Sequence, residues 1–138
     1  MNELEFIQRI DCNFPYNNRE KCSALIAQAV SISDNCAFMV LHELVRPPKK
    51  VQPSLIKELY EEWKNTFNHP LVEEIEVSVN ALLNNVSLET SKGLEIMKKV
   101  ENYPGQYNAL ALAYYSTNEK SGKVKSKHNS ILRAWANA

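Results

Sequence analysis

Apolar residues recur along most of this chain every three or four positions, which is the period of an amphipathic α-helix. The pattern is clearest between residues 70 and 117, where it predicts three consecutive helices joined by short turns. Proline favours the first turn of a helix, so we expect the first of the three to begin at Pro70. Its apolar positions are Leu71, Val72, Ile75, Val79, Leu82, Leu83 and Val86. The second ends near Tyr103, and its apolar positions are Leu94, Met97 and Val100. Pro104-Gly105 turns into the third, whose inward positions are predicted to be Tyr107, Leu110, Ala111 and Tyr114.

The amino-terminal part of the chain predicts three more helices. Asn2 is expected to cap a helix that runs through Ile10, with Leu4, Phe6 and Ile7 facing inward. Residues 11–17 read as a loop, because proline and asparagine disfavour a helix interior. Asn17 or Asn18 caps the second helix, whose apolar stripe is Cys22, Leu25, Ile26, Ala29 and Val30. Asp34 is expected to cap the third, which ends near Val45. Apolar residues cover most of its circumference, so it should be a central, buried helix.

The segment Arg46–Pro53 is the clearest interruption of the helical pattern, because its adjacent prolines stop a helix. It is too short to separate independent domains, so we interpret residues 1–138 as a single helical domain with a corner at 46–53. Ser54 is expected to cap the helix that follows. Its apolar positions are Leu55, Ile56, Leu59, Tyr60, Trp63 and Phe67. Residues 118–127 predict a polar, lysine-rich loop, and a last helix carries Ile131, Leu132 and Trp135.

These segments predict an all-α fold of about eight helices. The chain has only 3 glycines among 138 residues, which disfavours folds that depend on tight glycine turns. Pro70 and Pro104 each open a helix that follows another, at a spacing typical of helical-hairpin repeats. Two arrangements therefore stay open, a compact bundle and a short HEAT-like array of helical hairpins.

Charge and cysteine content limit the cellular compartment and the classes of partner that we expect for this chain. The 16 basic and 16 acidic residues cancel, so no net field attracts nucleic acid or an anionic membrane. Lys120, Lys123, Lys125 and Lys127 form a basic run, but it lacks the arginines and aromatic residues of a nucleic-acid surface. No apolar stretch is long enough to span a membrane, and the amino terminus does not resemble a signal peptide. The three cysteines are widely spaced and fit reduced thiols, so we expect a cytoplasmic protein.

Residue patterns that signal catalysis, metals or cofactors are not found in the sequence. His42 and Glu43 begin a zinc-binding HExxH pattern, but Arg46 stands where the second ligand is required. Cys36 and His42 are six residues apart on one predicted helix, so their side chains should point in different directions. The three glycines are scattered and form no phosphate-binding loop. We therefore predict no catalytic residues, no metal and no cofactor.

Two surfaces are candidates for binding a partner. Six glutamates lie on the two helices around residue 68, where they could form an acidic patch or the solvated faces of those helices. They are Glu58, Glu61, Glu62, Glu73, Glu74 and Glu76. Val77 lies among them on the face opposite its own apolar stripe. Tyr107 and Tyr114 could present rigid contact area to a partner or belong to the edge of the core.

The chain resembles small, all-helical bacterial immunity proteins. The resemblance lies in its size and in the segments Asn68-His69-Pro70-Leu71 and Tyr103-Pro104-Gly105-Gln106-Tyr107-Asn108. Members of this kind neutralise toxins, for example those of contact-dependent growth inhibition systems. The resemblance implies a non-catalytic protein that plugs the active site of a cognate toxin, with a nuclease domain as one candidate partner. It would give the glutamates the role of meeting a basic cleft, although the neutral net charge departs from that pattern.

Two alternatives come from other functional classes. A small helical enzyme could assemble its site from scattered residues such as His42, Glu43 and the glutamates. A regulatory adaptor could use the same helical surfaces without blocking a toxin. Substitution of His42 and His69 together would separate the enzyme from a binding protein, since only the enzyme would lose its function.

Overall fold

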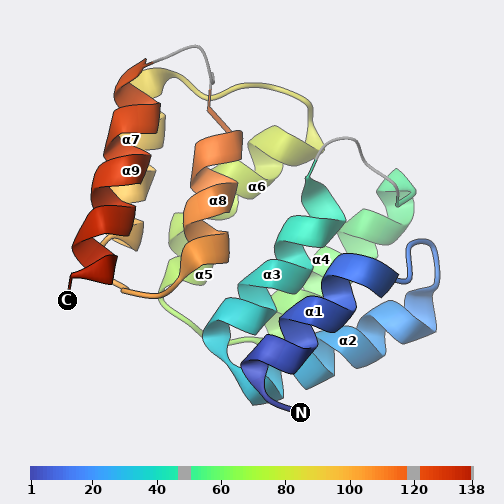
Figure 1. The fold of residues 1–138 in the computed structure, drawn as a ribbon. Coiled ribbons are helices and arrows are strands. Elements are labelled where there is room, and N and C mark those ends of the chain that lie inside the picture. Colours follow the sequence, from blue (N-terminus) through green and yellow to red (C-terminus); the bar gives the residue numbers. More distant parts are fainter. Residues whose placement is uncertain (47–50, 118–121, 138) are drawn as a thin grey trace. The chain divides into compact units, whose positions relative to one another are not determined.

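The computed structural model describes residues 1–46, 51–117 and 122–137, and it confirms the all-α prediction (Figure 1). The helices of these residues are α1 (Glu3–Asn13), α2 (Arg19–Ile32), α3 (Asp34–Val45), α4 (Pro53–Thr66), α5 (Leu71–Glu74), α6 (Glu76–Leu83), α7 (Thr90–Val100), α8 (Tyr107–Tyr115) and α9 (Gly122–Ala136). They pack into two compact units, Met1–His69 and Pro70–Ala138. The division falls after His69, whereas the predicted corner lies at 46–53, of which residues 47–50 are outside the described part. The single domain stays a prediction.

The first unit is built around α3, which contacts α1, α2 and α4. Nine of its twelve residues are buried, so the predicted central helix is confirmed. The apolar residues that cover most of α3 explain its position, because each neighbouring helix can bury one apolar stripe against it. Ser33 caps α3 by accepting a hydrogen bond from the Cys36 amide at 3.1 Å. The predicted cap, Asp34, is instead the first helical residue.

Side-chain caps set the beginnings of α1 and α2. The carboxamide oxygen of Asn2 accepts a hydrogen bond from the Glu5 amide at 2.8 Å, as predicted. Asn18 does the same for the Lys21 amide at 3.0 Å, which decides between the two asparagines. The prediction for the end of α1 was wrong, because the helix continues past Ile10 to Asn13. Ile10 lies one turn after Phe6, and both side chains are buried.

One inward position of α1 was also wrong. The side chain of Leu4 is 64% exposed, while Phe6 and Ile10 are buried. The buried pair has the four-residue spacing of one helix face, and Leu4 lies off that face. Sequence periodicity could not distinguish the two choices, because several apolar residues fall within one short helix.

The helix α4 closes the first unit with a cluster of aromatic rings. Trp63 is fully buried, and its ring centroid lies 5.7 Å from that of Phe38 and 5.2 Å from that of Phe67. The indole nitrogen of Trp63 donates a hydrogen bond to the Ala37 carbonyl at 2.8 Å. The helix begins at Pro53, one residue before the predicted cap Ser54, because the fixed φ of proline suits the first helical position.

The second unit departs from the prediction in its first helix. The expected helix from Pro70 is divided at Ile75 into α5 and α6, and Ile75 is buried at the junction. The α6 helix ends at Leu83, and Asn85 adopts a positive φ of 56° that stops any continuation. Val86 therefore leaves the helix and is 59% exposed, contrary to its predicted inward position.

The last three helices of the second unit begin or end at different residues than predicted. The helix α7 ends at Val100, and Tyr103 lies in the turn that follows. In α8 the buried face is formed by Ala109, Leu110, Leu112 and Ala113. Helix α9 already begins at Gly122, so the predicted loop is wrong for residues 122–127, and 118–121 lie outside the described residues. The buried Val124 supplies an apolar contact that the lysine-rich composition obscures.

A close approach of two backbone segments joins α7 to the end of α8. Gly93 faces Thr117, and a Cβ atom at Gly93 would lie only 2.0 Å from the Thr117 methyl carbon. The Leu88 amide donates a hydrogen bond to the Ser116 carbonyl at 2.8 Å. The Ser116 hydroxyl also donates to the Ala113 carbonyl at 2.8 Å and lies 2.9 Å from the buried Ser78 hydroxyl. Gly93 does not have a positive φ, so its backbone conformation does not require glycine. Glycine is needed here because a side chain would collide with Thr117.

Candidate functional site

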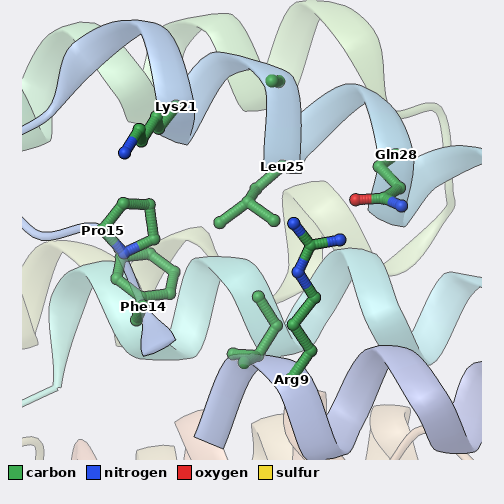
Figure 2. Close-up of a pocket in the computed structure, with 8 residues that line it drawn as sticks. Arg9, Phe14, Pro15, Lys21, Leu25 and Gln28 are labelled. Carbon is green, nitrogen blue, oxygen red and sulfur yellow. The ribbon is translucent and has the colours of Figure 1, made fainter. Parts of the chain in front are cut away.

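A groove between α1 and α2, with a volume of about 720 Å³, is a concave feature of the first unit (Figure 2). It forms because α1 packs mainly on α3, as α2 does, and the two helices make little contact with each other. Ile10, Phe14 and Leu25 provide apolar side chains at its base, and all three are nearly buried. The base of the groove therefore belongs to the packed core of the unit.

The polar side chains of the groove are hydrogen-bond donors. Arg9 extends from α1 toward Leu25 and Gln28 of α2, and Lys21 projects on the side of Pro15 (Figure 2). Arg9 and Lys21 are the charged residues of the lining, and both are exposed. Neither takes part in an ion pair or side-chain hydrogen bond with another described residue. The groove therefore combines an apolar base with positive charge that the described part of the chain does not neutralise.

One end of the groove is held by the loop between α1 and α2. The hydroxyl of Tyr16 donates a hydrogen bond to Glu43 Oε2 at 2.8 Å, and Arg46 Nη2 lies 3.2 Å from the same oxygen. The thiol of Cys22 donates to the Pro15 carbonyl at 3.3 Å. Burial, together with the Glu43 carboxylate, raises the pKa of Tyr16, so its hydroxyl remains a donor at neutral pH. These contacts fix the loop against α3.

We expect Tyr16→Phe to lower the free energy of unfolding by about 1–2 kcal/mol, because a hydrogen bond to a carboxylate is lost at a partly buried site. Chemical denaturation followed by circular dichroism measures the change. Tyr107→Phe is the matched control, since its ring is 50% exposed and the same oxygen is removed at a hydrated site. Equal stabilities of the two variants would contradict the anchoring role of Tyr16.

His42 makes the stability of the first unit depend on pH. Burial, with the nearby Arg46 guanidinium as a second cause, lowers the pKa of His42 to about 4. The unfolded chain keeps a histidine pKa of about 6.5, so it binds a proton between these values while the folded chain does not. The free energy of unfolding should therefore decrease as the pH falls from about 6.5 to about 4, and this contribution should then level off.

Denaturation midpoints measured across this pH range test the role of His42. The expected result is a smaller decrease for His42→Gln than for the wild type, because glutamine takes up no proton. A His128→Gln variant serves as the comparison for the second unit: because burial also lowers the pKa of His128, it should reduce the pH dependence of that unit's unfolding and leave that of the first unit unchanged. A pH profile unaffected by His42→Gln would contradict the assignment.

The six predicted glutamates are divided between the two units. In the first unit, Glu58 lies 3.8 Å from Arg19, Glu61 lies 3.0 Å from Lys64, and Glu62 accepts a hydrogen bond from the Ser23 hydroxyl at 3.0 Å; these glutamates all lie on α4. Much of their charge is thus matched by neighbouring groups of the same unit. An acidic surface made by all six residues stays a prediction.

In the second unit, Glu74 lies 2.7 Å from Lys99, and this contact raises the pKa of the lysine. Glu73 is exposed and Glu76 is half-buried. Val77 is 40% exposed, as expected for a residue opposite the apolar stripe. These residues could contact a partner without disturbing the buried face of α5 and α6.

The predicted inward position of Tyr107 was wrong, because half of its side chain is exposed. Its ring meets Trp135 edge-on at 5.4 Å, which holds the exposed tyrosine in place. Tyr114 is half-buried and packs against His128 at 4.7 Å. The structure therefore separates the two tyrosines into an exposed aromatic surface and a core edge, the two alternatives that the sequence left open.

Sequence reasoning missed Arg9, Lys21 and Gln28 as site residues. Each lies beside the buried stripe of its own helix, which is a signal that the sequence contains. The sequence does not show that α1 and α2 flank a common groove, because that depends on how both pack on α3. The side chains become a candidate site only through this tertiary arrangement.

None of the described helices has the combined length and hydropathy needed to cross a bilayer. Among the described side chains, histidine, cysteine, aspartate and glutamate do not gather in groups of three that could hold a metal ion. Comparison of the chain with protein families, curated proteins and solved structures finds no match.

Proposed function

We propose that this chain is a non-catalytic protein-binding module. The observation that supports the proposal best is the α1–α2 groove, where two cations without an ion pair to the described residues border an apolar base. A groove between two helices with this composition suits a partner segment that brings apolar and charged side chains together. A second candidate contact for a partner is the exposed ring of Tyr107, which packs against Trp135.

The more specific proposal is an immunity protein that binds and blocks a cognate bacterial toxin. It rests on the resemblance in size and helical layout described above, and a nuclease is one candidate toxin. Several glutamates are engaged in exposed ion pairs, and pairs at the surface contribute little to stability because solvent screens them. Such pairs can exchange their lysine or arginine for a basic group of the partner at little cost.

A cytoplasmic location belongs to this proposal. Cys22 and Cys36 are buried and free, and burial raises the pKa of both thiols. Two protonated, packed thiols fit a reducing compartment. A toxin that acts inside the cell would meet the protein there.

The proposal is tested by affinity capture from the native host, followed by expression of each captured protein with and without this chain. We expect one partner in a stoichiometric complex that stops growth when it is expressed alone and is harmless when co-expressed. A chain that is recovered only as a free monomer would contradict the binding function. A harmless stoichiometric partner would contradict toxin inhibition while supporting a binding module, including an adaptor.

The enzyme alternative is distinguished by the double variant His42→Gln/His69→Gln. His69 packs on Phe38 and Phe67 within the aromatic cluster, so folding of the variant is first verified by circular dichroism. We expect the folded variant to keep its partner and its protective effect. Loss of protection with intact binding would instead support a catalytic role.

A further inference from the structure

The α1–α2 groove has a charge pattern that identifies the chemistry of its occupant. Arg9 and Lys21 come from different helices, and their heads border the same apolar base (Figure 2). Gln28 adds a carboxamide from the side of α2. Arg19, Lys64 and Lys99 are matched by nearby carboxylates, whereas Lys57 and Lys98 have no ion pair with another described residue; Arg9 and Lys21 differ from these two because they line one concave surface. The groove cations lack such partners among the described residues.

We propose, on the basis of the proposed binding function, that this groove binds an acidic amphipathic segment of a partner protein. A carboxylate side chain of the segment pairs with the Arg9 guanidinium in a bidentate manner, and a second one reaches Lys21. Apolar side chains of the same segment pack on Ala24 and Pro15, beside the small exposed edge of Leu25. The groove would thus bind an acidic partner segment, whereas the glutamate surface would bind a cationic one.

The packing of the first unit explains why the groove can accept a segment without rearranging. Its base is already buried against α3, and the Tyr16–Glu43 hydrogen bond fixes the loop at one end. On this side of the interface, binding therefore orders mainly the long side chains of Arg9 and Lys21, which limits the entropy that this chain loses on association. Charge neutralisation should make the affinity decrease with added salt.

The test uses the full chain and two synthetic peptides with leucine and a charged residue in helical register. One peptide carries glutamate and the other carries lysine. We expect NMR amide shifts caused by the glutamate peptide to centre on α1 and α2, and the lysine peptide to cause none there. Arg9→Gln/Lys21→Gln should weaken binding of the glutamate peptide about tenfold.

Two matched controls separate the groove from general charge effects. Lys57→Gln/Lys98→Gln removes the same charge at exposed positions outside the groove and should leave the dissociation constant unchanged. Ala24→Glu places a carboxylate in the groove and should also weaken binding about tenfold, whereas Ala27→Glu, on an exposed position of α2 outside the lining, should not. Shifts outside the groove, or equal losses in test and control variants, would overturn the proposal.

The same variants distinguish failure of this inference from failure of the proposed function. A captured partner that binds Arg9→Gln/Lys21→Gln as tightly as the wild type would overturn the groove assignment and leave the binding module in place. Absence of any captured partner, together with specific glutamate-peptide binding, would contradict the immunity function and support the groove chemistry.

Discussion

Trp63→Ala is expected to lower the free energy of unfolding of the first unit by about 3–5 kcal/mol, the range measured for large aromatic residues removed from protein cores. Trp63 is fully buried and lies at the centre of a cluster with Phe38, Tyr60 and Phe67. Truncation would leave a cavity between α3 and α4, because both helices are held by other contacts. The indole hydrogen bond to Ala37 would also be lost.

Denaturant unfolding followed by far-ultraviolet circular dichroism measures the effect, because this signal does not depend on tryptophan fluorescence. Trp63→Phe separates the two contributions: it keeps much of the ring packing and removes the donor, so we expect a loss of about 1–3 kcal/mol. Ser54→Ala, at an exposed position of α4, is the control for helix content. A loss below about 1 kcal/mol for Trp63→Ala would show that the aromatic cluster is not the main core of this unit.

Gly93→Ala is expected to lower the free energy of unfolding of the second unit by about 1–3 kcal/mol, the usual cost of adding atoms to a filled core. The new Cβ would lie 2.0 Å from the Thr117 methyl carbon and 3.1 Å from Thr117 Cβ. Thr117 cannot turn away freely, because its hydroxyl donates to the Tyr114 carbonyl at 2.7 Å. In an open helix the same change would gain about 1 kcal/mol from helix propensity, so the sign itself is informative.

Gly122→Ala is the matched control, because a Cβ at that helical position would meet no other side chain or backbone segment of the described residues within 4 Å. It should be neutral or slightly stabilising. Thr117→Ser removes the clashing methyl group and keeps the hydroxyl, so it should recover part of the stability when combined with Gly93→Ala. A Gly93→Ala variant as stable as the wild type, measured by the same unfolding assay, would contradict the close approach.

Local sequence patterns predicted the fold class and the central helix because these depend on periodicity and composition. The apolar circumference of α3 identified it as buried, and the asparagine caps of α1 and α2 were visible in the sequence. The division at Ile75 was not predictable, since the apolar spacing continues through it without a proline or glycine. The start of α9 was missed because one buried residue, Val124, lies among lysines.

The candidate site was less accessible to sequence reasoning than the fold. Arg9 and Lys21 are separated by a loop and have no motif, and only their packing on a third helix gives them a common groove. The low glycine content correctly favoured helices, but it did not indicate that Gly93 packs closely against Thr117. Both features depend on residues that the tertiary structure brings together. The periodicity of apolar residues along the sequence does not reveal such contacts.

The position of α3 in the chain has a consequence during synthesis. This helix is apolar on nearly every side, and the ring cluster that covers one of its faces is completed by Trp63 and Phe67 of the following segment. Because a nascent chain leaves the ribosome in the order of its synthesis, α3 emerges about 20 residues before Phe67, which corresponds to a delay of about 1–4 s at the usual rates of translation. Throughout that interval α3 presents an uncovered apolar surface, and it is the part of the nascent chain that we expect chaperones to bind.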